Sequence, residues 1–167
     1  PGGQVGGFGR SIDFDGATFI VGRPIQGTGG SAIVYQWNDV ANLTGTTSVV
    51  AAPVPQAGEE FASGVALDGP WVFAGAFGFD FASGPFGGLN TGRTFVYNTA
   101  DLTTPDTAFT PLVANHQDEF GRVVAIDGTR LAVSAVNDDA VQVDGGAVYL
   151  FEFSGGWVLD EVIVSPE

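Results

Sequence analysis

A short acidic loop is the most direct candidate for chemistry in this chain of 167 residues. Four side chains that carry oxygen ligands fall within one stretch: Asn137, Asp138, Asp139 and Asp144. Carboxylate and amide oxygens are what Ca²⁺ prefers, and it takes roughly six to eight of them, so backbone carbonyls and water would have to complete the set. The loop is therefore a candidate calcium site. A solvated polar loop without a metal is the alternative interpretation.

A second loop, between residues 76 and 91, combines aromatic rings with glycines. Its candidate ligand-binding residues are Phe77, Phe79, Asp80, Phe81 and Phe86. Four Phe residues exposed together would form a costly apolar patch. They are therefore expected either to fold back against a neighbouring element or to stack on a carbohydrate or protein partner, with Asp80 accepting hydrogen bonds from hydroxyl groups.

Residues with the potential for catalysis do not form a recognisable set. His116 is the single histidine, and no serine stands in a nucleophile-elbow context. The carboxylate pairs Glu59-Glu60 and Asp118-Glu119 each precede a Phe at the start of a repeat, so they follow the repeat pattern rather than that of a glycosidase. We expect a protein that is not an enzyme.

The loops must be positioned by a tandem repeat that fills the chain. Copies begin at Phe8, Phe61 and Phe120, so their starts lie 53 and 59 residues apart. In each copy an Asp-Gly pair follows the opening Phe at the same offset: Asp15-Gly16, Asp68-Gly69 and Asp127-Gly128. We therefore divide the single domain, residues 1–167, into repeats at about 8–60, 61–119 and 120–167.

The third copy gives the clearest reading of one unit. Residues 120–126 and 129–134 read as two strands joined by a tight Asp-Gly hairpin turn. Gly pairs lead into two more strands, at 147–153 and 157–164. Four antiparallel strands form a β-meander with two apolar faces, which needs neighbours of its own kind to cover them. The sequence thus predicts an all-β protein of three such units, with Trp37, Trp71 and Trp157 packing between them.

Composition narrows the classes of partner. The formal net charge is −14, with 19 acidic residues against 5 arginines and no lysine. This charge repels phosphate backbones and anionic lipid, so we expect neither nucleic acid nor membrane insertion. No apolar run approaches the length of a membrane span. The absence of cysteine excludes disulfides and thiolate metal sites.

The recurring FG, DG and Gly-plus-aromatic-strand pattern resembles the FG-GAP repeat of integrin-α-type β-propellers, especially the secreted bacterial and archaeal versions. The resemblance covers Phe8 to about Val164 in three copies. It implies four-stranded propeller blades, and it also implies calcium loops of the D-x-D-x-D-G type between the first two strands. Here that connection has shrunk to the Asp-Gly hairpins, whose Asp residues are therefore interpreted as turn formers.

Three blades leave the question of closure open, because a propeller typically needs about four to eight. The chain could be a segment of a longer propeller or could associate with other copies of itself, and its start at Pro1 suggests a processed or excised piece. We expect a non-catalytic, extracellular interaction or structural module for adhesion or scaffolding, with a protein or carbohydrate partner. The alternatives are a calcium-binding or carbohydrate-binding module, or part of a larger secreted enzyme.

Overall fold

The computed structural model describes residues 6–39, 44–81, 89–139 and 142–166. Its regular elements over these ranges are twelve β-strands and no helix. They form three four-stranded antiparallel sheets, none of which closes on itself. The prediction of an all-β chain built from three β-meanders is confirmed, and the arrangement is consistent with the blades of a partial propeller. None of the described residues forms a helix long and apolar enough to cross a membrane.

Each blade is made by consecutive strands. Blade 1 contains β1 (Ile12–Asp15), β2 (Thr18–Arg23), β3 (Ser31–Asp39) and β4 (Thr44–Ala51). Blade 2 contains β5 (Gly64–Asp68), β6 (Trp71–Ala76), β7 (Arg93–Asn98) and β8 (Thr107–Phe109). Blade 3 contains β9 (Phe120–Asp127), β10 (Arg130–Ala135), β11 (Ala147–Phe153) and β12 (Trp157–Val164).

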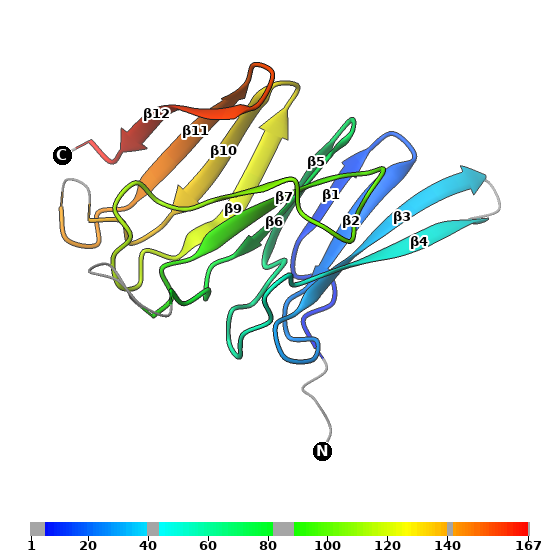
Figure 1. Ribbon diagram of the computed structural model, residues 1–167, viewed down its shortest axis with the longest axis horizontal. Coiled ribbons are helices and arrows are strands. Elements are labelled where there is room, and N and C mark those ends of the chain that lie inside the picture. The colour runs from blue at the N-terminus through cyan, green and yellow to red at the C-terminus, as the bar shows by residue number, and fades with distance from the viewer. Residues whose placement is uncertain (1–5, 40–43, 82–88, 140–141, 167) are drawn as a thin grey trace.

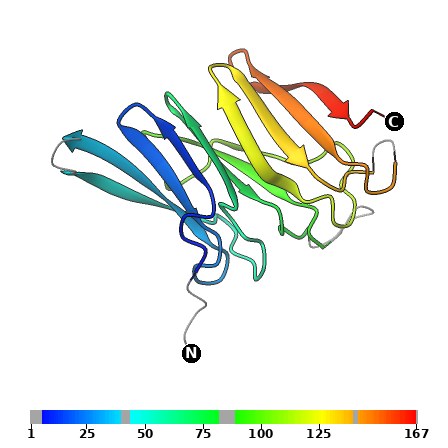
Figure 2. The same cartoon turned by 180° about the vertical axis from the view of Figure 1, so that it is seen from behind.

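The blades stand side by side in chain order, like the leaves of a fan (Figure 1). Seen from behind, the same order is preserved and the first hairpins of the three blades point the same way (Figure 2). The first strand of each blade packs against the first strand of the next. We call the face of a blade that looks toward the following blade its outgoing face, and the opposite one its incoming face.

The Asp-Gly hairpins are two-residue turns in which glycine carries the unusual backbone angle. Gly128 has φ of 59° and follows Asp127, which is still paired with Arg130 as the last residue of its strand. A positive φ at the first turn position alone is the type II′ pattern, which favours glycine there. The turn therefore depends on Gly, whereas the Asp side chain is left available for another contact.

That contact crosses to the next blade. Asp15 Oδ2 accepts a hydrogen bond from the backbone N–H of Gly69 at 2.9 Å, and Asp68 Oδ2 accepts one from Gly128. Asp15 and Asp68 thus each fasten their blade to the hairpin of the following blade. The sequence interpretation of these residues as turn formers missed this second role, because the acceptor and donor lie in different repeats.

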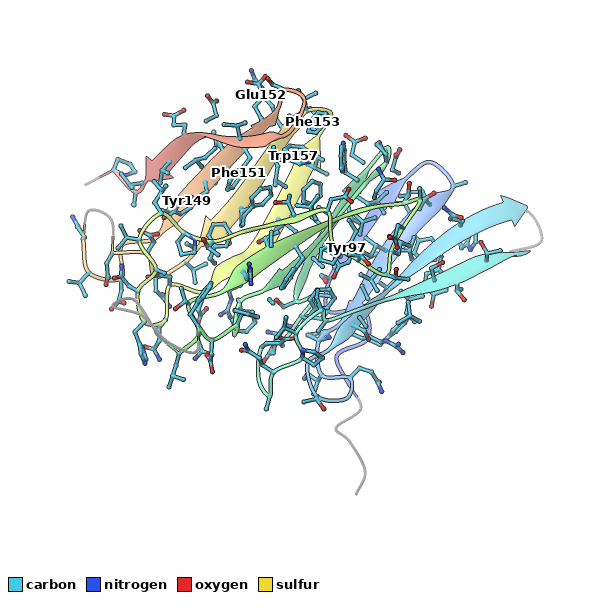
Figure 3. All side chains as sticks on the ribbon, in the orientation of Figure 1. Tyr97, Tyr149, Phe151, Glu152, Phe153 and Trp157 are labelled. Carbon is cyan, nitrogen blue, oxygen red and sulfur yellow. The ribbon has the colours of Figure 1, made fainter. Side chains whose placement is uncertain are left out.

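Two hydrophobic clusters fill the junctions between blades. The first joins apolar residues of blade 1, including Ile20 and Val34, to residues of blade 2 that include Leu67 and Tyr97. The second joins Phe73 and Val96 of blade 2 to residues of blade 3: Phe120, Val124, Leu131, Val133, Ala135, Ala147, Tyr149 and Phe151. Figure 3 shows Tyr149, Phe151 and Phe153 along β11 and Tyr97 on the far side of blade 2. Side chains alternate along each strand, so both faces of blade 2 are buried.

The blades approach most closely where glycines stand on outgoing faces. A Cβ added to Gly22 would lie 2.1 Å from the carbonyl oxygen of Ala62, and one added to Gly75 would lie 1.8 Å from that of Gly121. The opening residues Phe61 and Phe120 are fully buried and pair in parallel with Gly30 and Gly92 of the preceding blade. The Phe and Gly residues of the repeat therefore set the spacing between blades.

Candidate functional site

A cleft opens where the first strands of the three blades begin. Its volume is ≈ 490 Å³. The lining comes from all three blades: Arg10, Ser11, Ile12, Ser63, Gly64, Val65, Phe77, Arg122, Val123 and Val124. We call it the axial cleft, because β1, β5 and β9 are the strands that pack against one another. The fold thus gathers equivalent positions of three repeats at one place.

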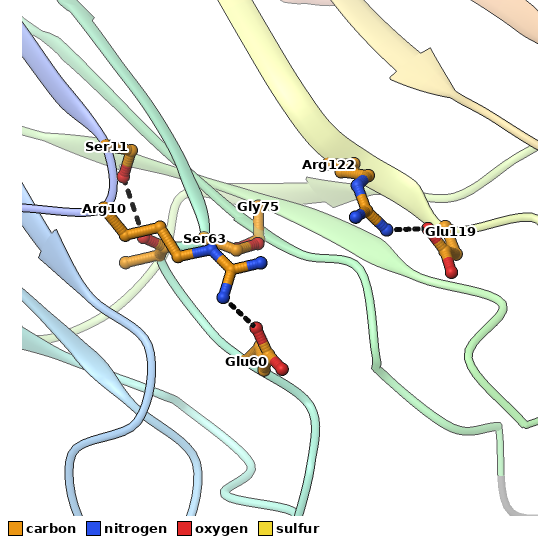
Figure 4. Close-up of polar contacts among 8 residues, drawn as sticks. Arg10, Ser11, Glu60, Ser63, Gly75, Glu119 and Arg122 are labelled. Atoms are coloured by element: carbon orange, nitrogen blue, oxygen red, sulfur yellow. Dashed lines mark hydrogen bonds and ion pairs between the residues drawn. The ribbon is translucent and has the colours of Figure 1, made fainter. Parts of the chain in front are cut away.

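Two arginines dominate the charge of the axial cleft, and each is paired with a carboxylate. Arg10 Nη1 lies 3.3 Å from Glu60 Oε2, so this ion pair joins the segment before β1 to the residue that precedes Phe61. Arg122 pairs with Glu119, three residues earlier (Figure 4). All four side chains remain partly exposed, so each pair stabilises the fold by no more than about 1 kcal/mol. The guanidinium groups therefore remain available to a ligand.

An aromatic ring borders one of these arginines. The guanidinium carbon of Arg122 lies 4.8 Å from the centroid of Phe77, within the range of a cation–π contact. The serine hydroxyls of the cleft are engaged with the backbone: Ser11 donates to the carbonyl of Ala62 at 3.0 Å (Figure 4), and Ser63 donates to that of Gly75 at 3.4 Å. The described lining offers hydrogen-bond donors and one aromatic ring, which suits recognition of carboxylate or hydroxyl groups.

The described aromatic side chains of the loop between residues 76 and 91 lie in two different places. Phe77 lines the axial cleft. Phe79 is buried against Phe95 and Phe81, at centroid distances of 6.1 and 5.3 Å, and the Arg93 guanidinium lies 5.4 Å from its ring centroid. Phe79 and Phe81 thus pack against the cluster at the junction of blades 1 and 2. Phe86 lies outside the described residues.

Asp80 is held by its own loop rather than presented to a ligand. Its backbone N–H donates to Gln56 Oε1 at 2.9 Å, and its backbone carbonyl accepts from Gln56 Nε2 at 3.1 Å. Its carboxylate accepts from the N–H of Asn90 at 2.7 Å. The side-chain amide of Gln56 therefore pins this loop to the connection that enters blade 2.

The acidic loop of the third repeat directs its side chains to protein partners. Asp138 is buried, and its Oδ2 accepts a hydrogen bond of 2.6 Å from the Tyr149 hydroxyl. Asp139 accepts from the N–H of Asp144 at 2.7 Å, and the Asn137 amide donates to the carbonyl of Gln117 at 3.0 Å. Among the described residues no three His, Cys, Asp or Glu side chains gather as they would around a metal ion. Calcium binding by Asn137, Asp138, Asp139 and Asp144 stays an untested prediction.

Two carboxylates are buried at the points where the chain enters blades 2 and 3. Glu59 and Asp118 stand two residues before Phe61 and Phe120, and both are buried. Burial raises the pKa of Glu59 to about 7, and the nearby Gln56 backbone offsets this only in part. Burial raises the pKa of Asp118 to about 6, against the hydrogen bond of 2.6 Å that it accepts from Asn115. These groups belong to the junctions and do not line the axial cleft.

Sequence reasoning did not identify the axial cleft. A signal was present, because Arg10 and Arg122 occupy the same position, two residues after the opening Phe, in a chain that has only five arginines. Its meaning depends on the convergence of three repeats, which no single repeat displays. His116, in contrast, lies exposed in the connection before blade 3.

Comparison with known protein families identifies one segment. Residues 103–151 match the model of the FG-GAP repeat. The match includes β8, the last strand of blade 2, then β9 and β10 of blade 3 and most of β11, with the hairpin Asp127-Gly128 inside it. A comparison with curated protein sequences found no significant match. The match to residues 103–151, together with three blades of like construction, supports the assignment of this chain to the FG-GAP repeat family.

Proposed function

We propose that this protein is a non-catalytic interaction module that works in adhesion or as a scaffold outside the cell. FG-GAP repeats are typically extracellular, β-propeller-like modules, and the chain carries such a repeat at residues 103–151. The blades supply a rigid support, and the axial cleft supplies the recognition surface. Propellers host many activities, so the argument for function rests on the cleft and not on the fold.

The observation that carries the proposal is the state of the polar groups in the axial cleft. Arg10 and Arg122 are oriented by carboxylates, and Ser11 and Ser63 donate to backbone carbonyls. Groups held in this way are preorganised for binding, whereas nucleophilic catalysis requires a hydroxyl that donates to a general base. A partner with carboxylate or hydroxyl groups fits the guanidinium donors.

Carbohydrate binding is the second candidate, and Phe77 favours it. The ring borders the cleft next to Arg122. An apolar sugar face stacks on such a ring while sugar hydroxyl groups accept hydrogen bonds from arginine. This candidate and protein binding share the same residues and differ in the partner alone.

Adhesion of protein-coated beads tests the proposal. Beads that carry the protein are passed over surfaces coated with dextran, gelatin or nothing, and the retained fraction is measured. We expect retention on one of the two coatings, with loss of most of it in Arg122→Gln. Asp106→Asn serves as the control, because Asp106 is exposed in the connection before β8 and does not line the axial cleft.

Each outcome has a meaning. Retention on dextran assigns the carbohydrate partner, and retention on gelatin assigns the protein partner. Equal behaviour of Arg122→Gln and Asp106→Asn would remove the axial cleft from the account. No retention above bare surfaces on either coating would contradict the adhesive function.

A further inference from the structure

Blade 1 presents an apolar incoming face to solvent. Strand pairing places two rows of side chains on it, and the first row contains Ile12, Val21, Ile33 and Val49. Ile12 and Val49 in this row are exposed, whereas Val21 is buried. The second row contains Phe14, Phe19 and Tyr35, with ring centroids 5.9 Å apart for the first pair and 4.5 Å for the second. Ile12 is 64% exposed and Phe14 is 57% exposed. So large an apolar surface normally marks an interface.

The equivalent faces of blades 2 and 3 are buried in the junctions. Phe14 corresponds to Leu67 and Ile126, and both of those residues pack in the hydrophobic clusters. Tyr35 corresponds to Tyr97 and Phe151, which are likewise buried. The incoming face of blade 1 therefore has the composition of a blade–blade junction without the preceding blade.

The outgoing face of blade 3 has a hollow where this aromatic face would fit. The hollow has a volume of ≈ 500 Å³, and its lining combines Ala125, Ala132 and Leu150 with charged side chains. These are Asp127, Arg130, Glu152, Asp160 and Glu161. Ala132 occupies the position of Ile20 in blade 1 and Phe73 in blade 2, so the hollow replaces a large side chain. Phe14 is in turn larger than Leu67 and Ile126. A small outgoing residue thus faces a large incoming one, as close packing requires.

The polar contacts of the junctions have unused counterparts on the same two faces. Asp15 and Asp68 each accept a hydrogen bond from the hairpin glycine of the next blade, and Asp127 is the third member of the series. Its matching donor is the backbone N–H of Gly16 in blade 1. Both residues are exposed. The two ends of the chain therefore carry complementary halves of this contact.

A third pair of side chains lies at the end of the faces near the Asp-Gly hairpins. At the junction of blades 2 and 3 the rings of Trp71 and Phe153 lie 4.9 Å apart. The equivalent outgoing residue in blade 3 is Arg130, and the equivalent incoming residue in blade 1 is Trp37. A guanidinium over an indole ring is a favourable cation–π contact.

A fourth pair lies at the other end of the faces. Phe8, which is 61% exposed, is the counterpart of the buried Phe61 and Phe120, and Gly146 is the counterpart of their partners Gly30 and Gly92.

Two side chains of blade 3 limit how closely another blade could approach its outgoing face. Gly64 and Gly75 of blade 2 let the backbone of blade 3 approach, whereas blade 3 has Val123 and Ser134 at those positions. Their Cβ atoms oppose an equally close approach by a following blade. A blade docked on the outgoing face of blade 3 would therefore lie farther away near Val123 and Ser134 than the blades do at the two junctions within the chain.

We propose that the incoming face of blade 1 docks on the outgoing face of blade 3 of a second copy of this chain. The contact is heterologous, so it runs head to tail and either closes into a ring or continues as a filament. This inference rests on the proposed scaffold function, and it identifies a second copy of the chain as the partner. It extends the interface that the chain already uses twice.

Sedimentation velocity over a range of concentrations tests the contact, with two complementary variants. Phe14→Glu disrupts the incoming face of blade 1, and Ala132→Glu fills the hollow of blade 3 with a charge. The wild-type protein is expected to sediment faster than a 17.2 kDa monomer as concentration rises. Association should strengthen in about 1 M salt, where the Debye length is about 3 Å, because the copies each carry a charge of −14.

Each variant alone should be monomeric, and an equimolar mixture of the two should form a one-to-one dimer through the faces that remain intact. Val143→Glu is the matched control, because Val143 is 84% exposed and lies on neither face, and it should behave like wild type. Ser134→Gly should tighten association, and Asp127→Asn should weaken it about fivefold. If a Glu variant loses its circular dichroism spectrum, Phe14→Ala and Asp127→Asn decide the question in its place.

Two results would overturn the proposal. The first is a wild-type protein that stays monomeric at every concentration and salt. The second is a mixture of the two Glu variants that stays monomeric while wild type associates, because this indicates a contact other than head to tail. Bead retention on dextran or gelatin in either case would keep the interaction function and remove the second copy as partner.

Discussion

The two junctions within the chain rely on the same backbone contacts but on different side chains. In both, a hairpin Asp accepts from the next Gly, a buried Phe pairs with a Gly of the preceding blade, and a glycine admits a carbonyl oxygen. The first junction has Glu59 and Ala62 where the second has Asp118 and Gly121. The two junctions therefore share their main-chain contacts and spacing, whereas the side chains around those contacts differ.

The two junctions differ most in the side chains that lie near the Asp-Gly hairpins. Trp71 and Phe73 of blade 2 contact Trp157 of blade 3 with ring centroids 5.8 and 5.3 Å apart. Thr18 and Ile20 hold the corresponding positions on the outgoing face of blade 1. Aromatic packing therefore supports the second junction over a greater length than the first, and each such ring pair adds about 1 kcal/mol beyond burial. Trp71 and Trp157 pack between blades as predicted, whereas Trp37 lies on the incoming face of blade 1.

The largest effect is expected from closing the space at a glycine contact. Gly75→Ala would place a Cβ 1.8 Å from the carbonyl oxygen of Gly121, so β6 of blade 2 and β9 of blade 3 must move apart. We expect a loss of about 4 kcal/mol in the free energy of unfolding, measured by urea denaturation. Gly22→Ala should act similarly at the other junction. Gly156→Ala, with open space around it, is the control, and an equal effect there would contradict the argument.

A second comparison concerns the residue after the opening Phe. Gly121 has φ of 88°, and an added Cβ would lie 2.8 Å from the carbonyl oxygen of Arg93. Ala62 already adopts φ of 66° at the same repeat position. Gly121→Ala should therefore cost about 3 kcal/mol, because strain and a backbone clash add. Ala62→Gly should change the free energy of unfolding by less than about 1 kcal/mol, because relief of strain offsets the lost methyl group.

The free energies of unfolding of Gly121→Ala and Ala62→Gly are measured by urea denaturation. Similar losses for Gly121→Ala and Ala62→Gly would mean that the two junctions do not share one geometry at this position.

The buried carboxyl of Glu59 should make stability depend on pH. Its pKa rises from 4.5 to about 7 on folding, so the folded state holds a proton that the unfolded state releases. Stability from this group is complete below about pH 4.5 and is lost as the pH rises through about 7. Glu59→Gln should raise the free energy of unfolding by about 2 kcal/mol above that pH and flatten the dependence.

Thermal unfolding of wild type and Glu59→Gln across this pH window provides the measurement. Asp118→Asn reports the second junction, where Asn115 already donates to the carboxylate. Parallel curves for wild type and Glu59→Gln would assign the pH dependence to other groups.

Much of the fold was predictable, because the repeats display their strands separately. The third copy predicted strands at 120–126, 129–134, 147–153 and 157–164, and the structure has β9 to β12 at Phe120–Asp127, Arg130–Ala135, Ala147–Phe153 and Trp157–Val164. Alternation of apolar residues and the punctuating glycines are local signals, so one repeat suffices to read them.

The site was not predictable in the same way, since its parts are distant in sequence. Phe77 stood out by its type, but Arg10 and Arg122 acquire meaning only when β1 and β9 are placed around one cleft. The acidic loop at Asp138 shows the converse. Its composition suggested a ligand set, whereas the hydroxyl of Tyr149, on a strand eleven residues away, is the partner of that carboxylate.

The division of the hydrophobic core has a consequence for how the molecule opens. One cluster spans blades 1 and 2, the other spans blades 2 and 3, and blade 2 alone contributes to both among the described core residues. Blades 1 and 3 can therefore detach as separate cooperative units, while blade 2 loses its order only when both have gone. We therefore expect the slowest amide hydrogen exchange in β6 and β7, at the centre of the chain, and unfolding that proceeds from the ends of the array inward.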